Sequence, residues 1–345
     1  LTHPLDIDWI DSLSDEFFEL GITAILRESA ARCAPAEQVF ELLEDYCKNG
    51  RVGVALHLLY AEQLWLRGRL AEAAQALKGT TFPPMMGRKA KALQGAIAFL
   101  TGNTSQSLTH YNNSIKVGGK SQQAKMLWFE YPATIVYFFA LLAEGSIESL
   151  KTAESYVLLI QRQNDHWLKP SAPLLFAVLQ QQQSKPTEGA KRFSQYSLKA
   201  TGLVALLEIY SLNWLQVDEF EEWISLQLPW LCKKLSKSGY SWLTLAMTEL
   251  LVSYQAESPF ARQSRKLRSQ IKSVSLLDVI ERKESWERSL DALTSLMTPA
   301  VQSAPTPTLE PTYRMVWRIR FESLDNWNLI PVEQKQIGRA SGRER

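Results

Sequence analysis

The sequence predicts an all-α body built of paired helices, followed by a short segment with β-strands. Between about residues 14 and 297, apolar residues recur at steps of three and four, the spacing of one helix face. Alternating strand-like patterns are nearly absent there, and the glycines are few and turn-like. A segment of about twelve residues also recurs within the chain, which favours a repeat architecture.

The composition is that of a globular protein. The chain has 345 residues, of which 46% are hydrophobic, and this excludes disordered, collagen-like and disulfide-scaffold proteins. Its three cysteines cannot form a closed set of disulfides, so we expect a reducing, cytoplasmic setting. The longest apolar run, residues 133–143, is shorter than the ~20 residues of a membrane-spanning helix, so no membrane partner is expected.

Apolar stripes mark the first helices. One stripe contains Phe17, Leu20, Ile25 and Leu26. A second contains Val39, Leu42, Leu43 and Tyr46. Because Pro35 is tolerated in a first helical turn, the second helix is expected to begin near Ala34.

An internal repeat sets the period of the helices. Residues 66–77 (LRGRLAEAAQAL) align with residues 100–111 (LTGNTSQSLTHY), and Gly68 and Gly102 lie 34 residues apart, the tetratricopeptide period. Each glycine is expected to end the first helix of a pair in a turn that needs a small residue. A poorer third copy follows, with Gly145 43 residues after Gly102.

Two kinds of side chain suit this packing. Small residues are expected to bring the second helix of a pair close to the first, at Ala71, Ala74 and Ser105. Bulky residues are expected to fill the space between hairpins: Trp65, Leu77 and Tyr111. Residues 1–185 are thus predicted to form a tetratricopeptide-like α-solenoid of helical hairpins, with a groove for a protein partner.

Residues 186–298 are expected to continue as helices without a clear period. The candidates are Leu203–Leu215, Phe220–Leu235 and Ser241–Tyr254. The acidic run Asp218–Glu222 fits a helix start better than a site for a basic partner, since acids favour the positive end of the helix dipole.

A basic strip is the one charge feature that suggests binding. No acid lies between Pro259 and Leu277, and five cations do: Arg262, Arg265, Lys266, Arg268 and Lys272. Helical spacing would place most of them along one flank, where they could neutralise nucleic-acid phosphates. The alternative is a solvated helix face, because the chain as a whole is close to neutral.

A boundary follows the helices. Four of the fifteen prolines fall in residues 299–312, which predicts an extended linker. Residues 313–336 then alternate apolar and polar side chains around a turn, which predicts a β-hairpin that opens a further, β-rich domain.

Both ends suggest a fragment. The chain begins at Leu1, and residues 337–345 (IGRASGRER) resemble the translation of a sequencing-adapter oligonucleotide. Those nine residues hold three arginines and one glutamate, so the other 336 residues carry 35 basic and 35 acidic side chains. A globally basic nucleic-acid binder is therefore not supported.

No catalytic, cofactor or metal residues can be named. Gly118–Ser121 shares letters with a phosphate-binding loop, but Ser114 stands where that loop needs glycine, so a helix end is expected instead. The four histidines are scattered, and Cys33 and Cys47 are fourteen residues apart, outside common zinc spacings.

Four segments resemble a known family. Residues 275–280 and 284–293, and then residues 313–319 and 329–335, are similar to a region of bacterial Swi/Snf-type DEAD/DEAH-box helicases. In that family a helical region precedes two motor lobes that bind ATP and Mg²⁺. The resemblance therefore implies a helicase parent that hydrolyses ATP, whose catalytic motifs have no counterpart here.

Two functions are expected from these observations. The first is a non-catalytic accessory or scaffold region of such a helicase or translocase, which recruits a partner or positions the motor on DNA. The alternative is a stand-alone tetratricopeptide-like adaptor or sensor arm that binds a peptide in its groove.

Overall fold

The computed structural model describes residues 10, 13–50, 52–117, 131–163, 166–183, 202–216 and 220–279, together with two strands. Contacts divide the chain into two units, residues 1–289 and 290–345. The predicted division between residues 185 and 186 falls inside the first unit. The linker prolines and residues 337–345 lie outside the described residues.

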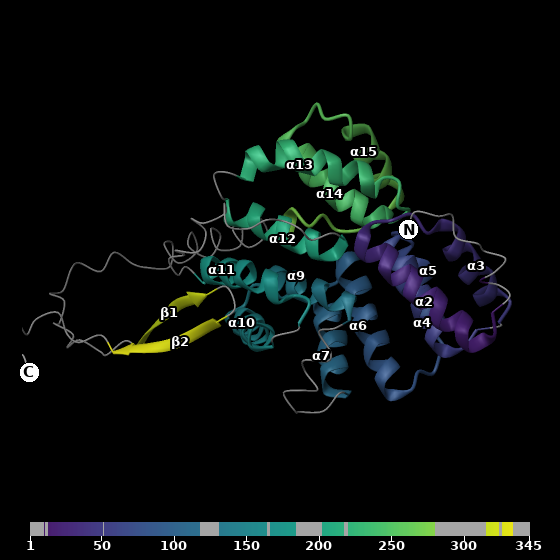
Figure 1. Ribbon diagram of the computed structural model, residues 1–345, viewed down its shortest axis with the longest axis horizontal. Helices are drawn as coiled ribbons and strands as arrows, with labels where there is room; N and C mark the ends of the chain where they lie inside the picture. Colours follow the sequence, from purple (N-terminus) through teal and green to yellow (C-terminus); the bar gives the residue numbers. More distant parts are fainter. Residues whose placement is uncertain are drawn as a thin grey trace, which may run out of the picture. The chain divides into compact units, whose positions relative to one another are not determined.

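The first unit is helical throughout its described part (Figure 1). Its first half contains α2 (Asp15–Arg32), α3 (Glu37–Lys48), α4 (Val54–Leu66), α5 (Leu70–Leu77), α6 (Pro84–Leu100) and α7 (Thr104–Val117). Its second half contains α9 (Ile135–Glu144), α10 (Ile147–Arg162), α11 (Ala172–Gln182), α12 (Gly202–Leu215), α13 (Phe220–Leu235), α14 (Ser241–Tyr254) and α15 (Ala261–Gln270). Short 3-10 turns, Pro132–Thr134 and Lys169–Ser171, precede α9 and α11. The all-α prediction is confirmed, and α13 and α14 have the predicted bounds. None of these helices is long and apolar enough to cross a membrane.

The glycine turns of the repeat are confirmed. Gly68 ends α4 with φ +77°, and Gly102 ends α6 with φ +90°, a left-handed backbone that favours glycine. Both turns make the same bonds: the Gly68 amide donates to Trp65 O and the Gly102 amide to Phe99 O, each at 2.9 Å. Gly145, with φ +68°, instead donates to Leu141 O, four residues back, which makes the third copy a different turn.

The close packing within a pair comes from residues other than the predicted small ones. Ala71 and Ala74 are exposed, whereas Ala73 is buried on the same face of α5 as Leu70 and Leu77. Helical spacing explains the correction, because positions 70, 73 and 77 share one face, and positions 71 and 74 lie about 130° and about 70° from its centre. Ser105, which corresponds to Ala71, is exposed as well. The predicted bulky residues are all buried: Trp65, Leu77 and Tyr111.

Gly95 brings α6 and α7 together. A Cβ at this position would lie 2.8 Å from the ring of Tyr111, so only glycine lets the buried ring rest against the α6 backbone. The Tyr111 hydroxyl then donates a hydrogen bond of 2.8 Å to Ala133 O, just before α9. The second helical pair is thereby joined to the third.

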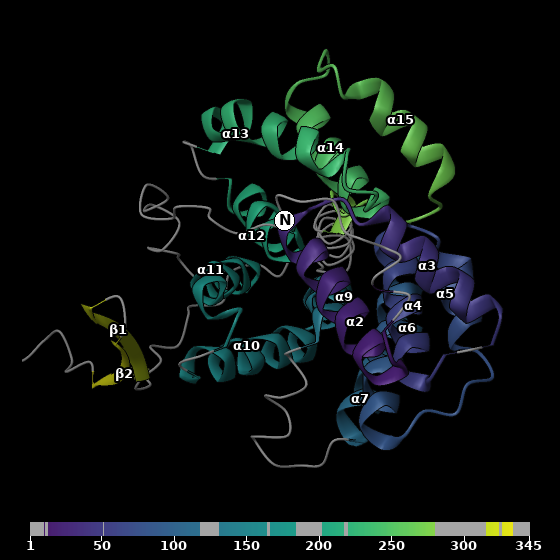
Figure 2. The same ribbon diagram turned by 45° about the vertical axis from the view of Figure 1, so that its right-hand side comes forward.

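The chain returns to its own beginning. Helix α12 contacts α2, and α14 contacts α4, as the two views of Figures 1 and 2 show. The ring centroids of Trp65 in α4 and Trp242 in α14 lie 5.4 Å apart. The Gly202 amide at the start of α12 donates a hydrogen bond of 3.1 Å to Cys33 Sγ at the end of α2. An open solenoid has contacts only between neighbouring repeats. The first unit therefore adds long-range packing to its helical pairs.

The second unit contains an antiparallel hairpin. Strand β1 (Met315–Ser323) pairs with β2 (Asn326–Glu333), and the register places Ile319 opposite Leu329. The strands cover the alternating part of the sequence, and residues 324 and 325 between them lie outside the described residues. Pro331 pairs with Trp317.

Candidate functional site

Helix α15 presents three of the predicted cations together. Arg262, Arg265 and Lys266 are exposed, and their spacing of three and four residues places them on one face of the helix. Ser264, on the opposite side, is buried against the rest of the unit. None of the three cations forms an ion pair with the residues that the structure describes. Such cations remain available to an anionic ligand.

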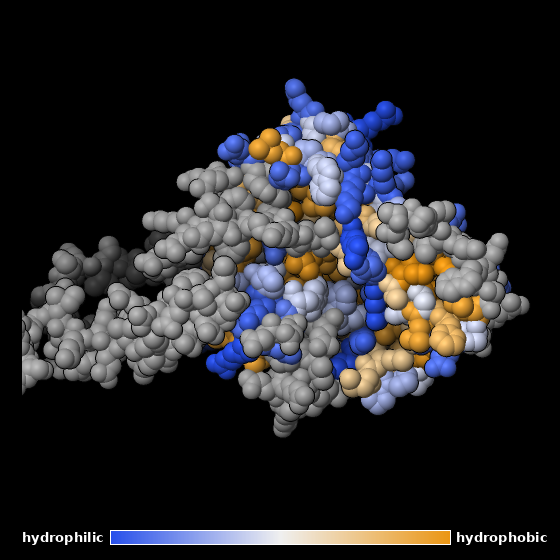
Figure 3. All heavy atoms as spheres, viewed as in Figure 1, coloured by the Kyte–Doolittle hydropathy of each residue, from blue (hydrophilic) through white to orange (hydrophobic). Residues whose placement is uncertain are grey.

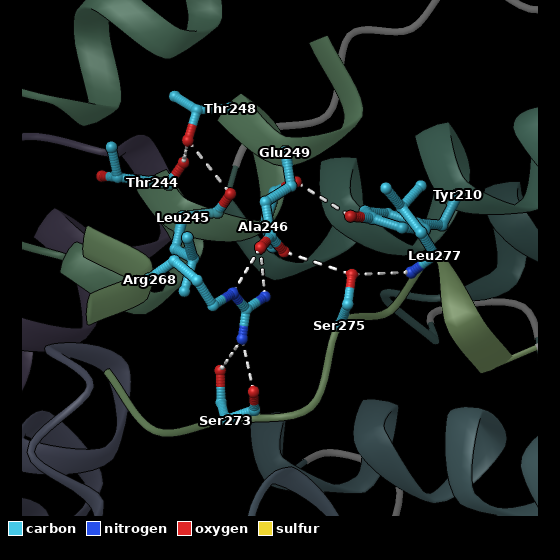
Figure 4. Close-up of polar contacts among 10 residues, drawn as sticks. All are labelled: Tyr210, Thr244, Leu245, Ala246, Thr248, Glu249, Arg268, Ser273, Ser275 and Leu277. Carbon is cyan, nitrogen blue, oxygen red and sulfur yellow. Dashed lines mark hydrogen bonds and ion pairs between the residues drawn. The ribbon is translucent and has the colours of Figure 1, made fainter. Parts of the chain in front are cut away.

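Arg268 is not part of this open face. Its Nε donates to Glu249 Oε1 of α14 at 2.5 Å, and its Nη1 donates to the carbonyl oxygen of Ser273 (Figure 4). The Ser275 hydroxyl completes the cluster by donating to Glu249 Oε2 at 3.3 Å. The guanidinium therefore ties α15 and the segment after it to α14. Arg268 therefore differs from Arg262, Arg265 and Lys266, because its charge already has a partner within the unit.

Lys272 also lies apart from the helical face. It is exposed in the extended segment after α15, between Ile271 and Val274, which both contact the repeat turns. A Cβ on Gly68 would lie 2.6 Å from Ile271 Cδ1, and the Val274 amide donates to Leu100 O at 2.7 Å. The five cations of the basic strip therefore fall into three groups. Arg262, Arg265 and Lys266 share an exposed helix face, Arg268 is paired with Glu249, and Lys272 lies in the extended segment.

The end of α13 borders α15. The Ser236 hydroxyl donates to Gln263 Oε1 at 3.0 Å, and Lys233 and Lys237 are exposed on either side of Ser236 in the sequence. Figure 3 shows hydrophilic side chains gathered over this upper part of the molecule. We call Lys233, Lys237, Arg262, Arg265 and Lys266 the basic face. The run LCKKLSK (residues 231–237) carries the cations at the end of α13 and in the turn after it, and it is separate in sequence from the basic strip of residues 262–272.

A groove of about 710 Å³ lies between α5, α6 and α7. The exposed Ala71 and Ala74 line it, so the small residues of the repeat open a surface instead of closing a helix pair. Lys78 and Lys272 also line the groove and make no ion pair with any described residue.

Arg69 contributes little free charge to the groove. It binds Glu44 at 2.7 Å and Glu72 at 2.5 Å. The hydrogen bond from Arg69 lowers the pKa of Glu44 to about 2, although partial burial opposes the shift.

His110 also lines the groove. Burial and the nearby Lys91 lower the pKa of His110, which favours its neutral form.

The described residues contain no group of three or more metal-binding side chains. Cys33, Cys47 and Cys232 are free thiols. Burial raises the pKa of Cys47 and Cys232 to about 12, which disfavours the thiolate that a nucleophile needs. Of the acidic run, Glu221 and Glu222 occupy the first turn of α13, as expected for a helix start. Gly118–Ser121 lies outside the described residues.

Comparison of the chain with protein-family models, curated proteins and solved structures gives no match in any of the three.

Proposed function

We propose that this chain is a non-catalytic helical accessory region of a Swi/Snf-type ATP-dependent helicase or translocase, where it positions the motor on DNA or recruits a partner. The sequence resemblance of residues 275–293 and 313–335 supports the family. The exposed cations of α15 carry the proposal of a DNA contact. ATP and Mg²⁺ would bind the motor lobes of the parent, and the three free cysteines fit a cytoplasmic setting.

Within this proposal, α4–α5 and α6–α7 act as tetratricopeptide-like hairpins of a solenoid that the later helices close. The 34-residue spacing of Gly68 and Gly102 and their matching turns support this assignment. The hairpin of β1 and β2 would open the β-rich section that precedes the motor in the family.

Charge reversal tests the DNA contact. The variant Arg262→Glu, Arg265→Glu, Lys266→Glu removes three phosphate contacts, so the slope of log K against log salt should fall by about 3. Affinity for a labelled 20-bp duplex at 50 mM salt should fall more than tenfold, measured by fluorescence anisotropy.

A matched variant controls for overall charge. Lys116, Lys151 and Arg162 are exposed on α7 and α10, and their reversal to Glu makes the same change in net charge. This control should retain the salt slope of the unmodified chain. Equal losses in the two variants, or no loss in the α15 variant, would contradict a local DNA contact.

The groove favours a second function, that of a stand-alone adaptor which binds a partner peptide. Its volume of about 710 Å³ falls in the range of ligand sites, and Lys78 and Lys272 supply charge for an acidic segment. The variant Ala71→Arg, Ala74→Trp should abolish binding of a purified partner in calorimetry, and the α15 reversal should not. The opposite pattern would reject the adaptor.

A further inference from the structure

Helix α13 presents an apolar patch beside the basic face. Leu226 is 67% exposed and Trp230 is 61% exposed. Trp230 follows Leu226 by four residues, and Lys233 and Lys237 follow Trp230 by three and seven residues. These spacings place the four side chains along one line of α13 and the turn after it. The opposite side of α13 is anchored in the core by Ile224, Leu228, Leu231, Cys232 and Leu235.

Two contacts involve this end of α13. Lys234 Nζ lies 5.5 Å from the centroid of the Trp230 ring, within the range of a cation–π contact. The Ser236–Gln263 hydrogen bond of 3.0 Å then joins this end of α13 to α15. The end of α13 that carries Trp230, Lys233 and Lys237 is therefore connected to the helix that carries Arg262, Arg265 and Lys266.

The charges around the patch are ordered along α13. The exposed acids Glu221 and Glu222 stand in the first turn, and the cations stand at the other end of the helix, next to α15. Glu257, in the connection from α14 to α15, is the exposed acid nearest in sequence to Arg262. The cationic end, with Trp230 beside it, complements a polyanion that also offers flat apolar groups.

We propose that this surface binds single-stranded nucleic acid, with a base stacked on Trp230 and the backbone phosphates on the basic face. The inference deepens the proposed DNA contact and rests on it. Aromatic side chains beside a cationic surface bind single strands because unpaired bases expose their faces for stacking. A duplex keeps its bases stacked inside, so Trp230 would meet only the sugar–phosphate backbone and gain little.

Two labelled oligonucleotides and one duplex test the inference. Trp230→Ala in the full chain should weaken binding of dT20 about tenfold, the effect of losing one stacked base, and should change 20-bp duplex binding less than twofold. Trp230→Phe should retain most of the affinity because it keeps an aromatic face. U20 is measured in parallel, and a loss for either single strand supports the proposal and identifies the nucleic acid.

An exposed aromatic elsewhere supplies the control. Phe17 on α2 is 64% exposed, and Phe17→Ala should leave all three affinities unchanged. Unchanged dT20 and U20 binding by Trp230→Ala would overturn the inference. So would a loss confined to anionic phosphatidylserine vesicles, which would assign the patch to a membrane.

The two proposals fail separately. If the α15 reversal weakens every nucleic acid but Trp230→Ala weakens none, only the stacking inference falls. If the α15 reversal changes nothing, the DNA contact falls, and the single-strand inference falls with it.

Discussion

At the scale of single residues, Arg67 is a buried charge with contacts to several elements. Its side chain is 4% exposed, and its guanidinium lies 3.9 Å from the centroid of the Phe40 ring and 4.9 Å from that of Tyr240. Glu37 Oε2 lies 3.4 Å away, and Arg67 also donates to Gln63 at 2.8 Å. Burial lowers the pKa of Arg67, while Tyr240 and Glu37 oppose that shift. One side chain thus joins α3, α4 and the turn before α14.

Arg67→Ala should lower the free energy of unfolding by about 3 kcal/mol, since it leaves a cavity and removes the charge that three elements share. Arg69→Ala is the matched control, because Arg69 is 32% exposed and its ion pairs are partly screened, with an expected cost of about 1 kcal/mol. Urea titration followed by circular dichroism measures both. Equal costs would show that the buried position of Arg67 has no special weight.

Glu208 should make stability depend on pH. It is 8% exposed and accepts a 2.7 Å hydrogen bond from Ser171. Burial raises its pKa, and the hydrogen bond only partly opposes this. The folded state therefore binds its proton more tightly than the unfolded state does. Stability from this group is present below the unfolded pKa and is lost as pH rises through the raised folded pKa.

Glu208→Gln removes that loss, because glutamine keeps an acceptor for Ser171 and carries no charge. The variant should have a free energy of unfolding close to that of the parent at pH 4, and an increasing advantage as pH rises toward 7. Urea titrations at pH 4, 5.5 and 7 measure the difference. Parallel stability curves across this range would contradict the assignment.

At the scale of elements, the two glycine turns are equivalent in backbone but not in surroundings. The extended segment after α15 crosses both turns, with Ile271 against Gly68 and Val274 against Gly102. Three extended residues span about 10 Å, close to the spacing of packed helices, so one short segment can cover two repeats. A Cβ would lie 2.6 Å from Ile271 at the first turn and 3.6 Å from Val274 at the second.

Gly68→Ala should therefore cost at least about 1 kcal/mol more than Gly102→Ala, since both pay for a left-handed backbone but only the first also meets a clash. Replacing Ile271 by Ala should remove most of that difference in a double-mutant cycle. Chemical denaturation of the four variants measures it. A cycle with no coupling would contradict the contact between Ile271 and the Gly68 turn.

Local chemistry was predictable from sequence, and long-range contact was not. The turns at Gly68 and Gly102 follow from a short pattern, since a helix that ends in a left-handed residue needs glycine at one position. In the sequence, Arg268 cannot be distinguished from the other cations of the basic strip. Its partner Glu249 lies nineteen residues earlier, on another helix. The exposed Trp230 also had no sequence signal, because an apolar residue in a helix is predicted as core.

At the scale of the molecule, the chain is nearly neutral, but its positive charges are concentrated in one region. The whole sequence has 38 basic and 36 acidic residues, but the basic face gathers five cations from α13, the turn after it and α15. Net charge alone argues against a nucleic-acid binder, and the arrangement of charge argues for one. Helices α13 and α15 both pack on α14, and α14 packs on α4. The basic face is therefore attached to the body of the first unit.

This packing predicts that residues 13–279 unfold as one cooperative unit. Trp242 and Leu175 are 1% and 2% exposed, on α14 and α11. Trp242→Ala and Leu175→Ala should each cost about 3 kcal/mol, and each should lower the hydrogen-exchange protection of α4 and α14 amides by the same amount. In an array with contacts only between neighbours, a change in α11 would act mainly on nearby helices. Unchanged protection of α4 in Leu175→Ala would therefore show independent repeats, and equal losses in both helices would show that the return of α14 to α4 couples the whole unit.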